Sequence, residues 1–160
     1  MLETAFSWLA AGFAVSFLHE LGHFTVAALR GWPVAELRIG AGPTVFRAGM
    51  LRVRLLPFGG GILMPVPPRH LAVPILWGGL LTTAFTTAAA VAAFFSTGQH
   101  SLFLFGTATL GVAAFFANID PGVPGSDGSF LFGARPTPWV WVRQGLFLTL
   151  LVPTAAHFMP

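Results

Sequence analysis

Four apolar stretches, each about as long as the hydrocarbon core of a bilayer is thick, dominate this sequence. They cover about residues 5–29, 71–95, 101–117 and 138–158 of the 160-residue chain. A helix needs about 20 mostly apolar residues to cross that core. Only 8% of the residues are charged, whereas a soluble domain carries roughly 25%. We therefore expect an all-α polytopic membrane protein with about four transmembrane helices, formed as a single domain over residues 1–160, with the lipid bilayer as its main surroundings.

The segment between the first two apolar stretches, residues 30–70, has a different character. Glu36–Ile39 resembles a short strand, and Leu51–Leu55 alternates apolar and charged residues as a half-buried strand does. Glycines punctuate the segment as turns. We expect a small β-hairpin or sheet on the membrane surface, between the first and second helices.

The arginines predict the orientation of the chain in the membrane. Six of the eight lie between residues 30 and 69, and basic loops remain in the cytoplasm. The predicted topology places the β-containing loop in the cytoplasm and both termini outside, in a multi-pass protein of the cell membrane. The first apolar stretch lacks a basic start, so we interpret it as a retained span and not a signal peptide.

The composition also restricts ligands and partners. The chain has no cysteine, so a bound metal ion would be held by His, Asp or Glu. The net charge of +3 comes from eight arginines and only five acids. This balance reflects scarce acids more than a basic patch, so no nucleic-acid partner is expected.

The strongest chemical signal is the run His19-Glu20-Leu21-Gly22-His23, an HExxH pattern inside the first apolar stretch. Residues four apart share one face of a helix, so both imidazoles can bind one metal ion. Glu20 is close enough to act as a general base on a water molecule at that ion. These residues predict a hydrolytic metal site.

The alternative reading is that these are polar residues satisfied by ordinary hydrogen bonds. Two histidines and a glutamate within one apolar span are costly in lipid unless they are paired or solvated. The same span contains no arginine or lysine before its end. Binding a metal ion is the simplest way to satisfy all three side chains.

A catalytic zinc ion takes three protein ligands, so a third side chain must join the two histidines. Asp127 precedes Gly128 and an apolar run, and it can lie on a turn that re-enters the bundle. Asp120 is nearer the third helix and is a serious competitor. The residues alone favour Asp127 only modestly.

The chain resembles the site-2 protease family of intramembrane metalloproteases. The resemblance extends over about residues 15–132 and rests on several motifs in order. These are His-Glu-Leu-Gly-His-Phe at 19–24, Gly42-Pro43, Leu56-Pro57-Phe58-Gly59-Gly60, and Asn118 and Pro121 followed by Asp127-Gly128. Gly125-Ser126 departs from the Leu that commonly precedes Asp-Gly in the family. The PDZ or CBS domain of many members is not expected within this chain.

The resemblance implies a role for each matching residue. It makes His19, His23 and Asp127 the ligands of one Zn2+ ion per chain and Glu20 the general base. Asn118 would position substrate or stabilise the oxyanion, and it could equally be a hydrogen bonder in helix packing. Gly59 and Gly60 would place an edge strand for an extended substrate, and a plain turn explains them equally well.

Three functional hypotheses follow. The first is an intramembrane zinc metalloendopeptidase that cuts transmembrane protein substrates, with an active site open to the cytoplasm. The second is a catalytically silent protein of the same fold that binds metal or client proteins; the presence of Glu20 argues against it, because metal binding alone does not need that carboxylate. The third is a small transporter, which would be expected to carry polar residues along more than one helix.

Overall fold

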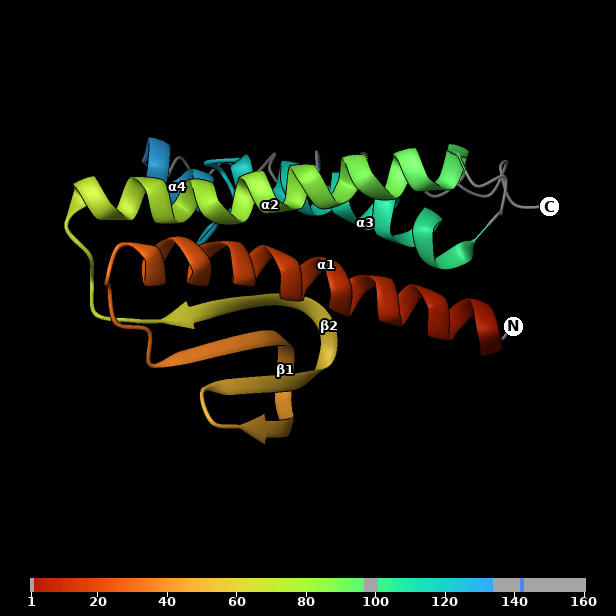
Figure 1. Ribbon diagram of the computed structural model, residues 1–160, viewed down its shortest axis with the longest axis horizontal. Helices are drawn as coiled ribbons and strands as arrows, with labels where there is room; N and C mark the ends of the chain where they lie inside the picture. Colours follow the sequence, from red (N-terminus) through yellow and green to blue (C-terminus); the bar gives the residue numbers. More distant parts are fainter. Residues whose placement is uncertain (1, 97–100, 134–141, 143–160) are drawn as a thin grey trace.

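The computed structural model describes residues 2–96, 101–133 and 142. Four helices and one β-hairpin make up this part of the chain (Figure 1), in the order α1 (Leu2–Leu29), β1 (Glu36–Ala48), β2 (Leu51–Leu63), α2 (Arg69–Ser96), α3 (Leu102–Ile119) and α4 (Asp127–Phe132). The hairpin lies between α1 and α2, and the chain is mostly helical, both as predicted. Apart from residue 142, the predicted span at 138–158 lies outside the described residues.

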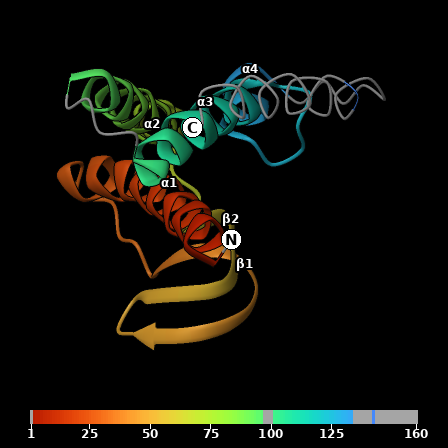
Figure 2. The same ribbon diagram turned by 90° about the vertical axis from the view of Figure 1, so that its right-hand side faces the viewer.

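Three long helices pack beside one another (Figure 2). Their closest contacts are at small residues. α1 crosses α2 where Gly22 faces Gly78, and a methyl group added to Gly78 would lie only 2.6 Å from the Gly22 carbonyl oxygen. α2 and α3 are antiparallel, because Gly111 faces Thr87 and Phe105 lies 5.8 Å, centroid to centroid, from Phe94. Small side chains therefore determine how closely the helices approach.

Among the described residues, α2 and α3 are each long and apolar enough to cross a membrane, by length and composition. α1 has 28 residues and is long enough as well. It falls short in hydropathy because His19, Glu20 and His23 lie within it. The site residues themselves therefore weaken the hydropathy signal of the helix that presents them.

The hairpin is a folded, four-segment sheet and is larger than the sequence predicts. Residues 36–39 pair with residues 60–63 on one side and with residues 51–53 on the other. Residues 44–48 pair with residues 51–54 along the far edge. Both strands bend midway, β1 at Gly40–Pro43, so two strands supply four paired segments. Residues 60–63 form the edge nearest α1 (Figure 1).

The sheet folds back along α1 and does not project from its end. Pro57, on β2, packs against Gly12, and the Ser16 hydroxyl donates a hydrogen bond of 3.0 Å to the Pro57 carbonyl oxygen. Leu37 and Ile39 are buried. The bend of the sheet therefore lies level with the middle of α1, much farther along that helix than a loop confined to the membrane surface would reach.

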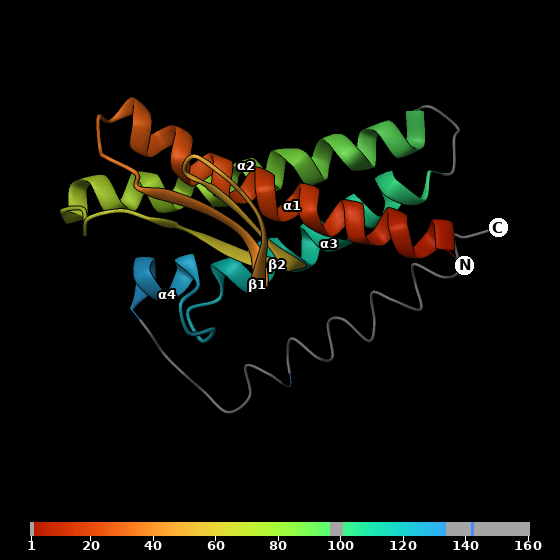
Figure 3. The same cartoon turned by 90° about the horizontal axis from the view of Figure 1, so that it is seen from below.

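After α3 the chain turns back toward α1 and α2. α3 ends at Ile119, and its C-cap residue Asp120 donates its backbone N–H to the Phe116 carbonyl oxygen at 3.2 Å. The Asp120 carboxylate accepts a 2.8 Å hydrogen bond from the Gly122 amide. The Pro- and Gly-rich segment 120–126 is irregular, as expected, but residues 127–132 form a short helix that the sequence did not indicate. In Figure 3 α4 lies toward the end of the helices where α1 ends and α2 begins.

Candidate metal centre

Three buried side chains from two distant segments converge beside the α1–α2 crossing. The Nε2 atoms of His19 and His23, one turn apart on α1, are 3.1 Å from each other. Asp127, the first residue of α4, places Oδ2 3.4 Å from the His19 Nε2 atom and Oδ1 3.3 Å from the His23 Nε2 atom. In the described part of the chain, these three residues form a cluster able to hold a metal ion.

The spacing of these atoms fits a zinc ion. Zinc bonds of about 2.0–2.2 Å in a tetrahedral arrangement separate neighbouring ligand atoms by about 3.3–3.5 Å. The two imidazole nitrogens are 3.1 Å apart, and each lies 3.3–3.4 Å from one of the two Asp127 carboxylate oxygens, so these distances are close to that value. In addition, Oδ2 of Asp127 is buried without a hydrogen-bond partner. A cation would satisfy this oxygen, which is otherwise costly to bury.

The atoms behind the two imidazoles determine which ring nitrogen faces the cluster. The Nδ1 atom of His23 lies 2.7 Å from the Ile75 carbonyl oxygen, which can only accept, so Nδ1 carries the proton. The Thr83 hydroxyl donates to the Gly79 carbonyl oxygen and therefore accepts from His19 Nδ1, 2.8 Å away. Both Nε2 atoms are left as lone-pair donors for a metal.

Glycines on both helices, Gly22 on α1 and Gly78 and Gly79 on α2, make room for this arrangement. A Cβ atom added to Gly79 would clash with the His23 imidazole, and one added to Gly22 would clash with the Gly78 carbonyl oxygen. The two helices can therefore approach closely enough for Thr83 and Ile75 to contact the histidines. The sequence alone did not indicate this role of Thr83, because nothing in it distinguishes Thr83 from the other threonines of α2.

The loop before α4 aims Asp127 into the cluster. Ser126 is the N-cap of α4: its hydroxyl accepts from the Ser129 amide at 3.1 Å and donates to the Asp120 carbonyl oxygen at 2.7 Å. Gly125 adopts a positive φ of 77° that favours glycine. Gly128 packs so tightly on the Ile119 carbonyl that a side chain would not fit. The Gly-Ser-Asp-Gly sequence thus builds a specific turn.

Asp120 and Asp127 have different positions. The Asp120 carboxylate binds the backbone of its own turn, whereas the Asp127 carboxylate faces both histidines. Of the two candidates left open by the residues, Asp127 is therefore the one that the fold brings to the cluster.

Glu20 lies on the side of α1 that faces the sheet. It is only 6% exposed, and a Cβ atom added to Gly60 would come within 2.8 Å of its Oε1 atom. A residue with a side chain at position 60 would press on this carboxylate. Gly60 therefore allows β2 to pass directly beside Glu20.

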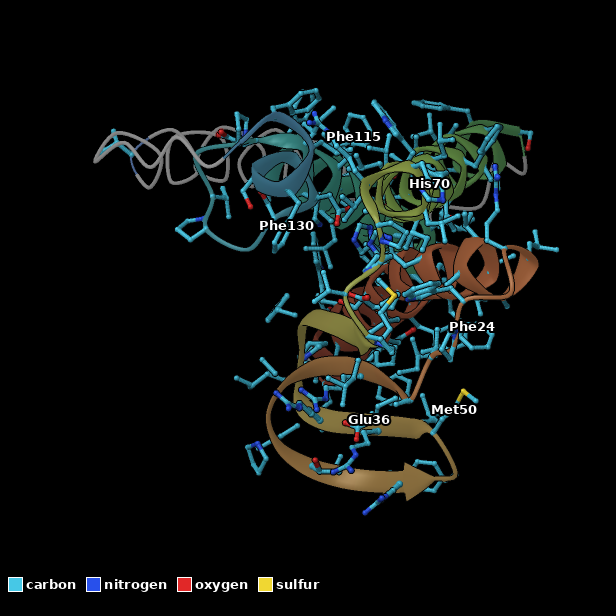
Figure 4. All side chains as sticks on the ribbon, turned by 90° about the vertical axis from the view of Figure 1, so that its left-hand side faces the viewer. Phe24, Glu36, Met50, His70, Phe115 and Phe130 are labelled. Atoms are coloured by element: carbon cyan, nitrogen blue, oxygen red, sulfur yellow. The ribbon has the colours of Figure 1, made fainter. Side chains whose placement is uncertain are left out.

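A cavity of about 1080 Å³ opens at the cluster. His19, Glu20, His23 and Asp127 line it, together with Gly59, Gly60, Asn118 and many apolar side chains. Asn118, in the last turn of α3, donates its side-chain amide to the Ala114 carbonyl oxygen at 3.0 Å. All seven residues predicted for the site thus border one space. Phe130 of α4 also borders it, with 70% of its surface exposed (Figure 4).

Comparison with known proteins agrees with this geometry. Residues 8–123 match the family model of Peptidase family M50, which is well over half of the chain. The chain belongs to peptidase family M50. M50 is a family of membrane zinc metalloproteases, in accord with the resemblance found in the sequence and with the two candidate spans.

Individual M50 relatives match over shorter segments. The zinc metalloprotease RasP of Geobacillus kaustophilus is 39% identical over 67 residues, which is 39% of this chain and 16% of the relative. The protein CPE1693 of Clostridium perfringens, whose name describes it as a candidate zinc metalloprotease, is 45% identical over 60 residues, or 35% of this chain and 18% of the relative. The chain therefore matches less than a fifth of the length of these relatives.

Proposed function

We propose that this chain is an intramembrane zinc endopeptidase that hydrolyses peptide bonds in or near transmembrane segments of membrane proteins. The observation that supports it most directly is the cluster itself. Two imidazole nitrogens and a carboxylate have the spacing of zinc ligands, and a second carboxylate lies beside them in a cavity. Membership in M50 agrees with this proposal.

His19, His23 and Asp127 would hold one zinc ion. When bound, zinc supplies Lewis-acid activation of water and of a peptide carbonyl. Glu20 is the remaining ionisable side chain within the HExxH run, and it faces the same cavity. Its carboxylate accepts a proton from the attacking water and returns it to the departing amine.

The edge of the sheet offers a position for the substrate. Residues 60–63 pair with β1 along one side only, and Gly59, Gly60 and Gly61 border the cavity. An extended peptide can add to such an edge through backbone hydrogen bonds. A peptide paired there would pass beside Glu20, because Gly60 contacts that side chain. Asn118 borders the same space and is proposed to bind the substrate carbonyl.

The proposed topology places both termini outside and the cavity open to the cytoplasm. Arg30 follows α1, and Arg69 begins α2. The hairpin carries Arg38, Arg47, Arg52 and Arg54. The end of α1, the start of α2 and the hairpin, which carry these arginines, lie toward one end of the helices (Figure 1). Basic residues at one end support a cytoplasmic location for that end.

The test is Glu20→Gln in the purified full chain, with a membrane-embedded reporter segment as substrate. Loss of the general base is expected to lower the rate of cleavage by about 10²–10⁴-fold. Zinc content should stay at one ion per chain, because Glu20 is not a proposed ligand. Glu3→Gln, an exposed change in the first turn of α1, is the matched control and should cut normally.

The two measurements separate the competing hypotheses. Cleavage by Glu20→Gln at the wild-type rate, with zinc retained, would remove the peptidase assignment. Zinc binding without cleavage in the wild-type chain, over a panel of transmembrane reporters, would favour the silent metal-binding alternative.

A further inference from the structure

One face of the hairpin gathers four arginines. Arg38 lies directly opposite Arg52 in the sheet, and Arg52 lies directly opposite Arg47 on its other side. Residues paired in register point to the same face, and so do residues two apart on one strand. Arg54 therefore joins them. We call these four residues the arginine face.

Glu36 provides the negative charge that pairs with the arginine face among the described residues. Glu36 forms an ion pair with Arg38 through Nε and another with Arg52 through Nη2, the latter at 2.6 Å. Within residues 2–96 and 101–133, these are the ion pairs of the arginine face, and Glu36 is the acid in both. The Arg38 hydrogen bond, followed by the charges of Arg38, Arg52 and Arg47, holds the pKa of the Glu36 carboxyl below its usual range. Four guanidinium groups and one carboxylate leave a net charge of three positives. Figure 4 shows Glu36 on the hairpin with nitrogen-bearing side chains around it.

The arginine face also has unused hydrogen-bonding capacity. The Nε atoms of Arg52 and Arg54 are buried and have no hydrogen-bond partner. Like charges placed directly opposite in a sheet destabilise it, and buried donors without acceptors add to the cost. An anion with several acceptor oxygens would offset the repulsion among the arginines, and phosphate groups suit the planar fork of arginine well.

The surroundings of the arginine face identify the source of that anion. The same hairpin exposes five large apolar side chains, each between 51% and 58% exposed, namely Val45, Phe46, Leu55, Leu56 and Phe58. They cluster toward the bend of the sheet, which lies level with the middle of α1. Exposed apolar surface next to arginines is typical of segments that lie at a membrane interface.

We propose that the arginine face binds the phosphate headgroups of anionic phospholipids, while the apolar bend beside it contacts their acyl chains. A soluble phosphate compound or an acidic protein segment would account for the arginines but not for the apolar bend. The proposal concerns lipid binding and does not depend on the peptidase activity.

The test measures lipid binding by the detergent-solubilised full chain with native mass spectrometry. Phosphatidylglycerol and phosphatidylcholine with the same acyl chains are compared on the wild-type protein. We expect phosphatidylglycerol to bind on the order of tenfold more tightly or better, with the difference falling as NaCl rises. Equal affinities for the two lipids would overturn the proposal, and this arm needs no variant.

The double variant Arg47→Gln/Arg54→Gln locates the site. Neither arginine contributes an ion pair to Glu36, so the sheet should be retained. Each arginine removed should weaken phosphatidylglycerol binding about fivefold, so the affinity of the double variant should fall on the order of 30-fold. The control variant Arg30→Gln/Arg69→Gln removes the same charge at the same end of the helices but outside the sheet. Its phosphatidylglycerol affinity should fall far less.

Three results would contradict the assignment to lipid. An equal loss of phosphatidylglycerol affinity in both double variants would indicate a general effect of net charge. Displacement of the lipid by millimolar inorganic phosphate would indicate a site for soluble phosphate compounds. Displacement by an acidic peptide at the same concentration as the lipid would indicate a protein-docking face.

Discussion

Thr83 illustrates how single atoms prepare the metal centre. Its hydroxyl is committed as a donor to the Gly79 carbonyl oxygen, so its lone pair faces the His19 Nδ1–H group. Thr83 is only 1% exposed, and water cannot replace it easily. We therefore regard Thr83 as a positioning residue that acts through His19.

Thr83→Val is the corresponding prediction, because valine keeps the shape of threonine and removes the acceptor. His19 Nδ1–H would be left buried without a partner, and the zinc affinity should fall about 10–100-fold. Thr83→Ser retains the hydroxyl and should therefore keep most of the wild-type zinc affinity. The affinity is measured by competition with a chromophoric chelator, and kcat should fall while KM changes little.

A purely structural role for Thr83 gives a different result. Valine and serine variants that bind zinc equally well, with equal losses in thermal stability, would show that the hydroxyl does not orient His19. Thr82 provides a neighbouring comparison, since its hydroxyl bonds to the Gly78 carbonyl oxygen within α2.

At the level of elements, the α1–α2 crossing aligns the histidines with the atoms behind them. Gly22 and Gly78 meet backbone to backbone, so a methyl group at Gly22 must push the helices apart. Overpacking of this kind costs about 1–3 kcal/mol. Because Thr83 and Ile75 lie on the displaced helix, the metal centre should be disturbed as well.

Gly22→Ala is therefore expected to lower the free energy of unfolding by about 1–3 kcal/mol and to weaken zinc binding. Gly106→Ala is the matched control at a helix contact: the added methyl group would lie 3.1 Å from the Ala11 Cβ atom and would not touch backbone. Denaturant unfolding in detergent and zinc competition give the two readouts. Equal stability of the two variants would show that α1 and α2 can move apart at their crossing without loss of stability.

The sequence predicted those features that depend on local geometry. The i, i+4 spacing of His19 and His23 fixes their common face on any α-helix, and long apolar runs fix α2 and α3. The strands were placed correctly at Glu36 and Leu51, but their lengths were underestimated. Bends at Gly40 and Pro57 let each strand continue in a new direction, and a period-two pattern does not reveal such bends.

Features that depend on contact between distant segments could not be predicted in the same way. Four threonines on α2 look alike in the sequence, and only the depth of the Gly22–Gly78 crossing selects Thr83. The choice of Asp127 over Asp120 came from family resemblance. Its physical basis is the Ser126 cap and the close fit of Gly128, and both depend on where α3 ends.

On the scale of the whole molecule, the metal centre connects parts of the chain that otherwise meet weakly. α4 has only six residues and cannot be stable by itself. Asp127 links it to α1 across the cavity. The cluster residues come from α1 and α4, and α2 supplies the atoms behind both histidines, so the metal would tie α4 to the α1–α2 pair.

Removal of zinc by a chelator should therefore have a local effect and a global effect. At a free zinc concentration of a hundred times Kd, binding to the folded state stabilises it by about 2.7 kcal/mol, and chelation removes that stabilisation. Without the metal, the Asp127 carboxylate is buried beside two lone pairs, and α4 should separate from α1. Amide hydrogen exchange in residues 120–132 is expected to accelerate more than exchange in α2 or α3. His23→Ala lacks a proposed ligand and should be insensitive to the chelator. A wild-type protein whose exchange in residues 120–132 is the same with and without zinc would show that α4 is held by packing alone, and that Asp127 is not a metal ligand.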